Sequence, residues 1–497
     1  MHRRVLLLSL FLCMAIHCGI AWSQSAQSDS ILEICVAQSE PAEGWREMQI
    51  GDQPAIYVSP NPVIREGDIE SINVWDDVGN IVISLKLTPA AGKKLAAASE
   101  ANLKKPMAII VEGSLVSAPI IQSTLGRDVA ISGDFSVDQA EQMVDALRPQ
   151  TRVPAFAEAD LKAFSKRMDR AFENRIFSGT VLIAVDGKIV LEKSVGYSNV
   201  KDKTPFAEDS SFRLASVSKQ FTAMGIMLLK EEGKLDFDDD IRKHLPSLPY
   251  EGVTIRHLLH HNSGLPDYIS LLDKHWDPKT DNDKKKTAYN KDAVRLFSEL
   301  TPKRDFAPGE RHEYSNTGYV LLGSIIEAAS GQNMHEFFKQ RVFEPLEMKN
   351  SYAFSPDENI FNPRHRVYGF SWLDKESFTE VDWNYLNGMV GDGGIYASAR
   401  DLLKWDQALY GEKLVSQKTL GEAFTSGKLN NGKETGYGFG WVVENTKDRG
   451  LVVSHGGSWV GFRTAIERKV GRKLTVIVLS NNSTSQLDRI LQAIEEL

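Results

Sequence analysis

A serine and a lysine lie three residues apart at Ser216 and Lys219, within the stretch RLASVSKQFT. On a helix this spacing puts both side chains on one face, one turn apart. A serine hydroxyl is a weak nucleophile at neutral pH and needs an adjacent base. A lysine becomes such a base when burial and nearby positive charge lower its pKa enough to leave a neutral amine. The pair therefore predicts a nucleophile with its base.

The same spacing recurs at Ser198 and Lys201, and about two such matches are expected by chance in a chain of 497 residues. The sequence context separates the two matches. Ser198 lies in the polar stretch GYSNVKDKTP, which predicts a loop with no helix after it. Ser216 precedes an apolar stretch that predicts a helix ending at Gly233. A helix N-terminus favours the oxyanion that forms on attack, so we expect Ser216 to be the nucleophile.

A second proton-transfer group is expected in a Tyr-x-Asn triplet, which occurs at residues 197–199, 314–316 and 385–387. Tyr314 is preferred because it follows the loop APGERHE and precedes the apolar helix GYVLLGSIIEAAS. That position fixes a tyrosine so that it faces a cleft. The alternative is a loop tyrosine that packs on its neighbours.

The stretch from His455 through Gly456 and Gly457 to Ser458 follows a predicted strand, GLVVS. Two glycines allow a substrate backbone to approach a strand edge closely. The backbone N–H of Ser458 could then join that of Ser216 as an oxyanion hole. The alternative is a glycine pair at a hairpin, with an incidental histidine beside it.

In this order the three elements resemble those of the serine β-lactamase and penicillin-binding protein superfamily, in particular its class C β-lactamase-like hydrolases. Family-like segments follow one another across residues 160–497: FRLASVSKQFTA, VTIRHLLHHNSGLPDY, YSNTGYVLLGSIIE, GDGGIYASARDLLKW, YGFGW and HGGSWVGFRT. The resemblance implies an α/β (α+β) fold, with an antiparallel sheet flanked by helices and a helical subdomain. It also implies a serine hydrolase that cleaves an amide or ester through an acyl-enzyme, without metal or organic cofactor.

The resemblance assigns roles residue by residue. Ser216 would be the acylated nucleophile, Lys219 its base, and Tyr314 the relay of protons to the leaving group. Asn316 would hydrogen-bond the substrate amide. The remaining substrate-binding positions follow the predicted strand: His455, Gly456, Gly457 and Ser458.

Position 455 departs from the lysine that many family members have there. A histidine has an ordinary pKa of about 6.5, so a permanent positive charge is not guaranteed. Recognition of an anionic β-lactam carboxylate is thereby weakened. This favours a D-amino-acid peptidase or esterase, acting on a small-molecule or peptide substrate such as a cell-wall peptide or ester. The alternative is an inactive binding protein that keeps the hydrolase fold.

Two further features are predicted to have no catalytic role. His257 and His261 are four residues apart, as in zinc helices, but the glutamate of His-Glu-x-x-His and a third ligand are missing, so no metal is expected. Asp392, in the stretch GDGG, is expected to belong to a loop that shapes the cleft.

Several elements that must position these residues can be predicted from patterns in residues 157–497, the expected hydrolase domain. Residues 179–195 predict two strands around the turn Asp186-Gly187. Residues 474–479 predict a buried strand, and residues 486–497 an amphipathic terminal helix.

A different region occupies residues 24–150, and the two prolines of the stretch RPQTRVPAF, residues 148–156, predict a linker at residues 151–156. Four segments over residues 55–148 resemble the head subdomain of the periplasmic region of SecD: NPVIREGDI, SLKLTPAAGKKLA, MAIIVEGSLVSAPII and ISGDFSVDQAEQMVDALR. The resemblance implies a small α+β module that binds extended peptide or an envelope partner. The alternative is a spacer without a ligand.

Patterns in this region predict a sheet covered by two helices. Residues 82–87 alternate as a half-buried strand, and Thr88 starts a helix that reaches Leu103. Residues 112–113 mark a hairpin, and Ser136 caps the second helix.

The first 23 residues predict a signal peptide, with a basic start, an apolar run from Val5 to Ile16 and a small-x-small cleavage site. The run falls short of the ~20 residues that span a bilayer. We therefore expect a secreted or periplasmic protein, with no later transmembrane segment. His17 disfavours lipid attachment at Cys18. The mature chain would keep only Cys35 and no internal disulfide, and a net charge of −8 argues against nucleic-acid binding.

Overall fold

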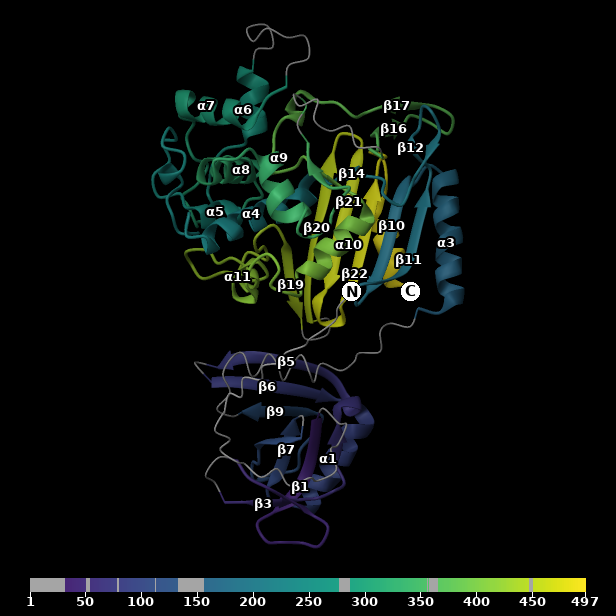
Figure 1. Cartoon of the computed structure of the whole chain (residues 1–497), viewed down its shortest axis with the longest axis vertical. Helices are drawn as coiled ribbons and strands as arrows, with labels where there is room; N and C mark the ends of the chain where they lie inside the picture. The colour runs from purple at the N-terminus through teal and green to yellow at the C-terminus, as the bar shows by residue number, and fades with distance from the viewer. Residues whose placement is uncertain are drawn as a thin grey trace, which may run out of the picture. The chain divides into compact units, whose positions relative to one another are not determined.

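The structure is a computed structural model of the chain (Figure 1). It describes residues 32–50, 54–77, 80–111, 113–132, 156–276, 287–354, 356, 365–446 and 450–497. The chain divides into two compact units, Met1–Thr151 and Arg152–Leu497. Among the described residues, no helix is long and apolar enough to cross a membrane.

The first unit is a small α+β domain with two sheets. Its strands are ordered β2-β3-β1-β7-β8 in one sheet, where β4 also pairs with β1, and β5-β6-β9 in the other. The strand bounds are β1 Leu32–Gln38, β2 Arg46–Met48, β3 Ile56–Val58, β4 Ile64–Arg65, β5 Ile69–Asp77, β6 Asn80–Leu87, β7 Met107–Val111, β8 Ser114–Ser117 and β9 Asp128–Ser132. The described helix is α1 Pro89–Ala101.

Two strand predictions in this unit are confirmed. The predicted strand lies within β6, and Ile83, Leu85 and Leu87 on one of its faces are at most 1% exposed. The predicted hairpin joins β7 to β8, where Val111 pairs with Ser114. The helix predicted from Ser136 lies outside the described residues.

Helix α1 begins where it was predicted but ends earlier. The Thr88 side chain accepts a hydrogen bond from the backbone N–H of Ala91 and caps the helix. The expectation that the helix reaches Leu103 is wrong. The N–H of Asn102 bonds to the carbonyl of Ser99, which closes the last turn, and the Leu103 side chain beyond it is 45% exposed.

The second unit is built around one six-stranded antiparallel sheet with the order β11-β10-β22-β21-β20-β19. The strand bounds are β10 Gly179–Val185, β11 Lys188–Val195, β19 Val442–Thr446, β20 Gly450–Trp459, β21 Phe462–Lys469 and β22 Leu474–Ser480. The expected strands at residues 179–195 and 474–479 are confirmed. Asp186 and Gly187 between β10 and β11 both have positive φ angles, +47° and +72°, as a type I′ turn requires.

Strands β10 and β22 of this sheet are buried on both faces. On one face, alternate residues of β10 and β22 pack against α3 Glu158–Glu173 and the terminal helix α12 Leu487–Glu495, which confirms the predicted terminal helix. On the other face they pack against a larger helical part. Figure 1 shows α10 on that face and the helices α4 to α9 beside it. Because both of their faces are covered, β10 and β22 are mostly apolar and do not alternate between apolar and polar residues.

The helical part contains the helix that follows Ser216. The helices of this part are α4 Lys219–Glu231, α5 Ile255–Leu259, α6 Tyr268–His275, α7 Asn290–Leu300, α8 Asn316–Ser330, α9 Met334–Phe338, α10 Ala399–Ala408 and α11 Gln417–Ala423. The antiparallel sheet, its flanking helices and the helical subdomain confirm the predicted fold class.

Short strands complete the unit. Their bounds are β12 Tyr197–Asn199, β13 Thr204–Pro205, β14 Phe212–Arg213, β15 Tyr352–Ala353, β16 Phe370–Trp372, β17 Phe378–Glu380 and β18 Ile395–Ala397. The stretch around Ser198 is therefore a small β12–β13 hairpin rather than the expected loop. The Ser198 hydroxyl is buried and donates to the backbone carbonyls of Thr204 and Pro205.

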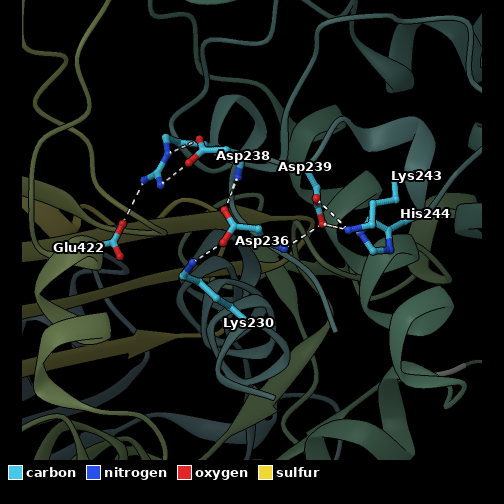
Figure 2. A network of polar contacts seen from close by, with 8 residues as sticks. Lys230, Asp236, Asp238, Asp239, Lys243, His244 and Glu422 are labelled. Carbon is cyan, nitrogen blue, oxygen red and sulfur yellow. Dashed lines mark hydrogen bonds and ion pairs between the residues drawn. The ribbon is translucent and has the colours of Figure 1, made fainter. Parts of the chain in front are cut away.

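A network of charged side chains holds the loop after α4 (Figure 2). Lys230 of α4 pairs with Asp236 at 2.6 Å, and Asp238 pairs with Arg256 of α5 at 2.8 Å. Arg256 also lies 3.1 Å from Glu422 of α11. Exposed pairs of this kind contribute little individually, but together they tie three helices to one loop.

Candidate active site

Ser216 stands on a strained turn between a strand and a helix. The 3-10 turn Ala215–Ser218 joins β14 to α4, and Ala215 has a φ of +50°, which is unusual for a residue with a side chain. The turn is held from two sides. The N–H of Leu214 bonds to the carbonyl of Ile395, and the Leu214 carbonyl accepts from the Thr464 hydroxyl at 2.6 Å. The position of the Ser216 hydroxyl is therefore fixed by both β18 and β21.

Lys219 is the first residue of α4 and is fully buried. Its Nζ lies 3.1 Å from Ser216 Oγ, 2.8 Å from Asn316 Oδ1 and 2.8 Å from the backbone oxygen of Asp392. An ammonium group has three N–H donors, and these three acceptors use them all. The nitrogen is thus held within proton-transfer distance of the serine hydroxyl.

Tyr314 lies in the loop before α8, and the residue is 45% exposed. Its ring centre is 5.1 Å from Lys219 Nζ and 4.3 Å from the ring centre of His261. The ring is therefore supported from behind by a buried histidine while its outer part is open to solvent. The structure thus brings Ser216, Lys219, Tyr314 and Asn316 together.

The other two Tyr-x-Asn triplets do not lie against Lys219. Asn199 of the first bonds to Asp202 in its own hairpin. Tyr385 of the last contacts Asp273 of α6, whereas its Asn387 accepts a hydrogen bond from the indole of Trp459. The preference for Tyr314 thus rests on the geometry as well as on the sequence context.

Strand β20 packs directly on the turn that carries Ser216. A Cβ atom added at Gly457 would lie 2.3 Å from the Leu214 carbonyl oxygen and 3.1 Å from the Ser216 nitrogen. Only a glycine fits this approach. Gly456 and Gly457 are within β20, paired with Ala465 and Thr464 of β21, so they are not a hairpin turn. Ser458 follows and lines a pocket together with Ser216.

His455 lies behind the strand instead of lining that pocket. The residue is 5% exposed, with Nδ1 2.6 Å from the Gly456 carbonyl oxygen and Nε2 2.8 Å from the Tyr437 hydroxyl. A carbonyl only accepts, so Nδ1 carries the proton, and Nε2 accepts from Tyr437. Burial, with the charge of Lys219 as a smaller cause, lowers the pKa of His455 to about 3. The histidine is therefore neutral at pH 7 and contacts Tyr437 rather than a substrate carboxylate.

The two histidines with zinc-like spacing do not share a helix. Helix α5 ends at Leu259, so His261 lies beyond it, with a φ of +55°. His257 Nδ1 accepts from the N–H of Thr254, and His261 Nδ1 accepts from the N–H of Ser315. Both rings support the backbone.

Comparisons with known proteins assign the two parts of the chain. Residues 158–496 match the family model described as Beta-lactamase, and residues 43–150 match the model of the SecDF P1 head subdomain. The chain belongs to the beta-lactamase family. It is a serine hydrolase of that superfamily, preceded by a domain like the SecD head.

Three similar proteins illustrate the family. Penicillin-binding protein 4* of Bacillus subtilis is 40% identical over 335 residues, which cover 65% of this chain and 73% of that protein. A D-aminopeptidase of Gluconobacter oxydans is 25% identical, over 62% of this chain and 56% of its own length. The crystal structure of D-amino acid amidase from Ochrobactrum anthropi SV3 has a TM-score of 0.56 and 25% identity, covering 68% of this chain and 99% of that one.

The pocket beside the serine of this beta-lactamase family protein also contains residues that the sequence analysis did not assign to the site. Arg213, Tyr268 and Trp459 line it together with Asp392. The Asp392 carboxylate accepts from the Tyr268 hydroxyl at 2.9 Å, and burial raises its pKa. All four residues lie inside family-like segments, but no spacing rule singles them out. A strongly polar residue next to a motif, such as Arg213 three positions before Ser216, was the available signal.

Proposed function

We propose that this protein hydrolyses the amide or ester bond of a D-amino-acid compound through an acyl-enzyme on Ser216. The observation that carries the proposal is the 3.1 Å contact between Lys219 Nζ and Ser216 Oγ in a buried site. A nucleophile in hydrogen-bond reach of a base, itself held by a third group, is the arrangement that activates serine. Here the third groups are Asn316 and the backbone of Asp392.

In the proposed reaction, the Lys219 ammonium first loses the proton that faces Ser216. Ser216 Oγ then attacks the carbonyl carbon, and its proton passes to the lone pair of the neutral amine. The carbonyl oxygen becomes an oxyanion that accepts from the backbone N–H groups of Ser216 and Ser458. The bond to the leaving group then breaks, and the leaving group takes a proton through Tyr314. Water attacks the acyl ester next, returns a proton to Ser216 and releases the acid.

The substrate class follows from two supports. His455 is neutral and faces Tyr437, so position 455 offers no cation for the carboxylate of a β-lactam. Relatives of this chain are named penicillin-binding protein and D-aminopeptidase, and a structural neighbour is named D-amino acid amidase. These names favour a D-amino-acid amide, peptide or ester over a β-lactam.

The test compares kcat/KM for D-alanine p-nitroanilide, its L enantiomer, D-Ala-D-Ala and the β-lactam nitrocefin. We expect cleavage of the D compounds, weak activity on the L compound and slow turnover of nitrocefin. Ser216→Ala should abolish every activity. Fast nitrocefin hydrolysis would overturn the proposed substrate class, whereas activity that survives in Ser216→Ala would overturn the mechanism.

We further propose that the protein is exported after cleavage near residue 23, with domains at residues 24–150 and 157–497 joined by a linker at 151–156. The SecDF head match supports an envelope location and a peptide-binding role for the first domain. Mass spectrometry of the mature protein from a cell fraction tests the cleavage. A protein in that fraction that still begins at Met1 would contradict the proposed cleavage.

A further inference from the structure

Arg213 is a buried cation in the wall of the pocket that contains Ser216. The residue is 2% exposed, and its Nε and Nη1 atoms have no hydrogen-bond partner. It ends β14, where it pairs with Tyr396 of β18, three positions before the nucleophile. The backbone therefore fixes it close to the reacting serine.

Burying an unpaired charge is costly unless an anion or aromatic face compensates for the lost water. The rings of Phe354 and Tyr396 lie 5.7 and 6.0 Å from the Arg213 guanidinium and offset only part of this cost. The neighbouring Arg366 packs at similar distances from the same two rings, but it also pairs with Asp382 at 2.5 Å. Among the described residues, Arg213 has no such ion pair.

The carboxyl group that lines the pocket does not form an ion pair with Arg213. Asp392 is the carboxyl group there, and Tyr268 already donates to it. The charges of Lys219 and Arg213 both act to lower the pKa of Asp392, so both basic groups lie near it. Arg213 is therefore a buried cation in the pocket wall whose Nε and Nη1 have no partner, and it can pair with a negative charge from a ligand.

The side of the substrate that enters this pocket follows from the proton transfer. The leaving group must receive its proton through Tyr314, which lies with His261 and Tyr437. Tyr314 does not line the pocket, whose walls include Arg213, Asp392, Ser458 and Asn316. The acyl part of the substrate, on the opposite side of the scissile bond, therefore enters the pocket.

We propose that Arg213 binds a carboxylate on the acyl group of the substrate, so that the preferred substrates are amides or esters of a short acyl group with a terminal carboxylate, such as D-glutamyl. The inference rests on the proposed acyl-enzyme on Ser216. The carboxylate forms a charge-assisted pair with the guanidinium and is not consumed in the reaction. Arg213 is thus a specificity-determining residue.

The first test compares D-glutamyl and D-glutaminyl p-nitroanilide, which differ in the charge of one terminal group. We expect the wild-type protein to prefer the D-glutamyl compound roughly tenfold or more in kcat/KM. Arg213→Gln should bring the ratio close to one, and Arg213→Lys should keep part of it. Arg366→Gln removes the neighbouring arginine and should leave the ratio as in the wild type. An unchanged ratio in Arg213→Gln, or no preference in the wild type, would overturn the proposal.

The second test needs no turnover. Calorimetric titration of Ser216→Ala with glutarate and with its uncharged diamide, glutaramide, measures recognition of the carboxylate alone. We expect binding of glutarate only, and its loss when Arg213→Gln is added. If circular dichroism finds Arg213→Gln unfolded, the proposal is tested by comparing the two ligands on Ser216→Ala and by the substrate preference of Arg213→Lys. Equal binding of the two ligands would overturn the inference.

The two tests separate this inference from the proposed function. Selective glutarate binding without any acyl adduct on Ser216 would support the Arg213 site and overturn the acyl-enzyme. Turnover of both anilides without a charge preference would support the acyl-enzyme on Ser216 and overturn the Arg213 site.

Discussion

At the scale of single residues, the site depends on which groups are charged and which are neutral. Lys219 donates hydrogen bonds to Ser216, Asn316 and the backbone of Asp392, so partners from three segments determine its position. His455 is the contrasting case, because it is buried and bonds to Tyr437 as a neutral ring. A neutral histidine next to a basic lysine avoids a repulsion that a second cation would create.

The lowered pKa of His455 predicts a dependence of stability on pH. The unfolded chain binds a proton at this histidine below about pH 6.5, whereas the folded protein does so only near pH 3. Between these values the unfolded state binds more protons, so the free energy of unfolding falls as the pH is lowered. We therefore expect the free energy of unfolding, measured by urea denaturation from pH 7 to 4, to change less steeply with pH in His455→Gln than in the wild type. The difference in this pH dependence should correspond to at most about one proton.

The control for this prediction is His275→Gln, on an exposed position of α6. Equal slopes for His455→Gln and the wild type would mean that His455 takes up its proton in the folded protein as well. That result would contradict the buried neutral histidine.

At the scale of elements, catalysis is expected to depend on how closely β20 approaches the turn before α4. Gly457 sets that distance, since its missing side chain leaves room for the backbone of Leu214 and Ser216. The preceding glycine, Gly456, is not constrained in this way. A Cβ atom at Gly456 would have its nearest neighbour at 3.9 Å, the Thr464 carbonyl oxygen.

These two glycines give a matched pair of substitutions. Gly457→Ala should push β20 away from Ser216, open the expected oxyanion hole and lower kcat by roughly 10²-fold or more. Gly456→Ala should stay within a few-fold of the wild type, because its methyl group makes only ordinary contacts. Steady-state kinetics on one anilide substrate measures both. Equal losses in the two variants would contradict a special role for the approach at Gly457.

The elements also separate what sequence can predict from what it cannot. The strands of residues 179–195 and 474–479 and the helix after Ser216 were predictable because local periodicity and turn residues determine them. The burial of His455 was not, because it depends on Tyr437, which another part of the chain brings to it. Nor was the charge of the pocket, since Arg213, Tyr268 and Asp392 meet only through the tertiary fold. The motifs located Ser216 and Lys219, but they did not reveal what surrounds them.

At the scale of the whole molecule, the two compact units have separate hydrophobic cores. Within the described ranges, each core cluster contains residues of one unit: Leu32 and Leu95 belong to one, Phe221 and Leu479 to another. The core clusters around the sheet and helices that hold Ser216 thus consist of residues of the second unit.

Removal of residues 1–151 tests this separation. The shortened chain should fold cooperatively, and its kcat/KM on a small anilide should stay within about twofold of the full-length protein, because the core clusters around Ser216 contain only residues of the second unit. Thermal unfolding and steady-state kinetics measure the two quantities. A large loss of activity with an intact fold would mean that the first unit contributes to the site.

The central claim is that Ser216 carries the acyl group. Mass spectrometry after incubation with a fluorophosphonate probe, followed by peptide mapping, tests it most directly. Ser198→Ala, which alters the other Ser-x-x-Lys match, is the control that should label like the wild type. We predict a single adduct on the peptide that contains Ser216 and none in Ser216→Ala. An adduct on another residue, or one that persists in Ser216→Ala, would contradict the account.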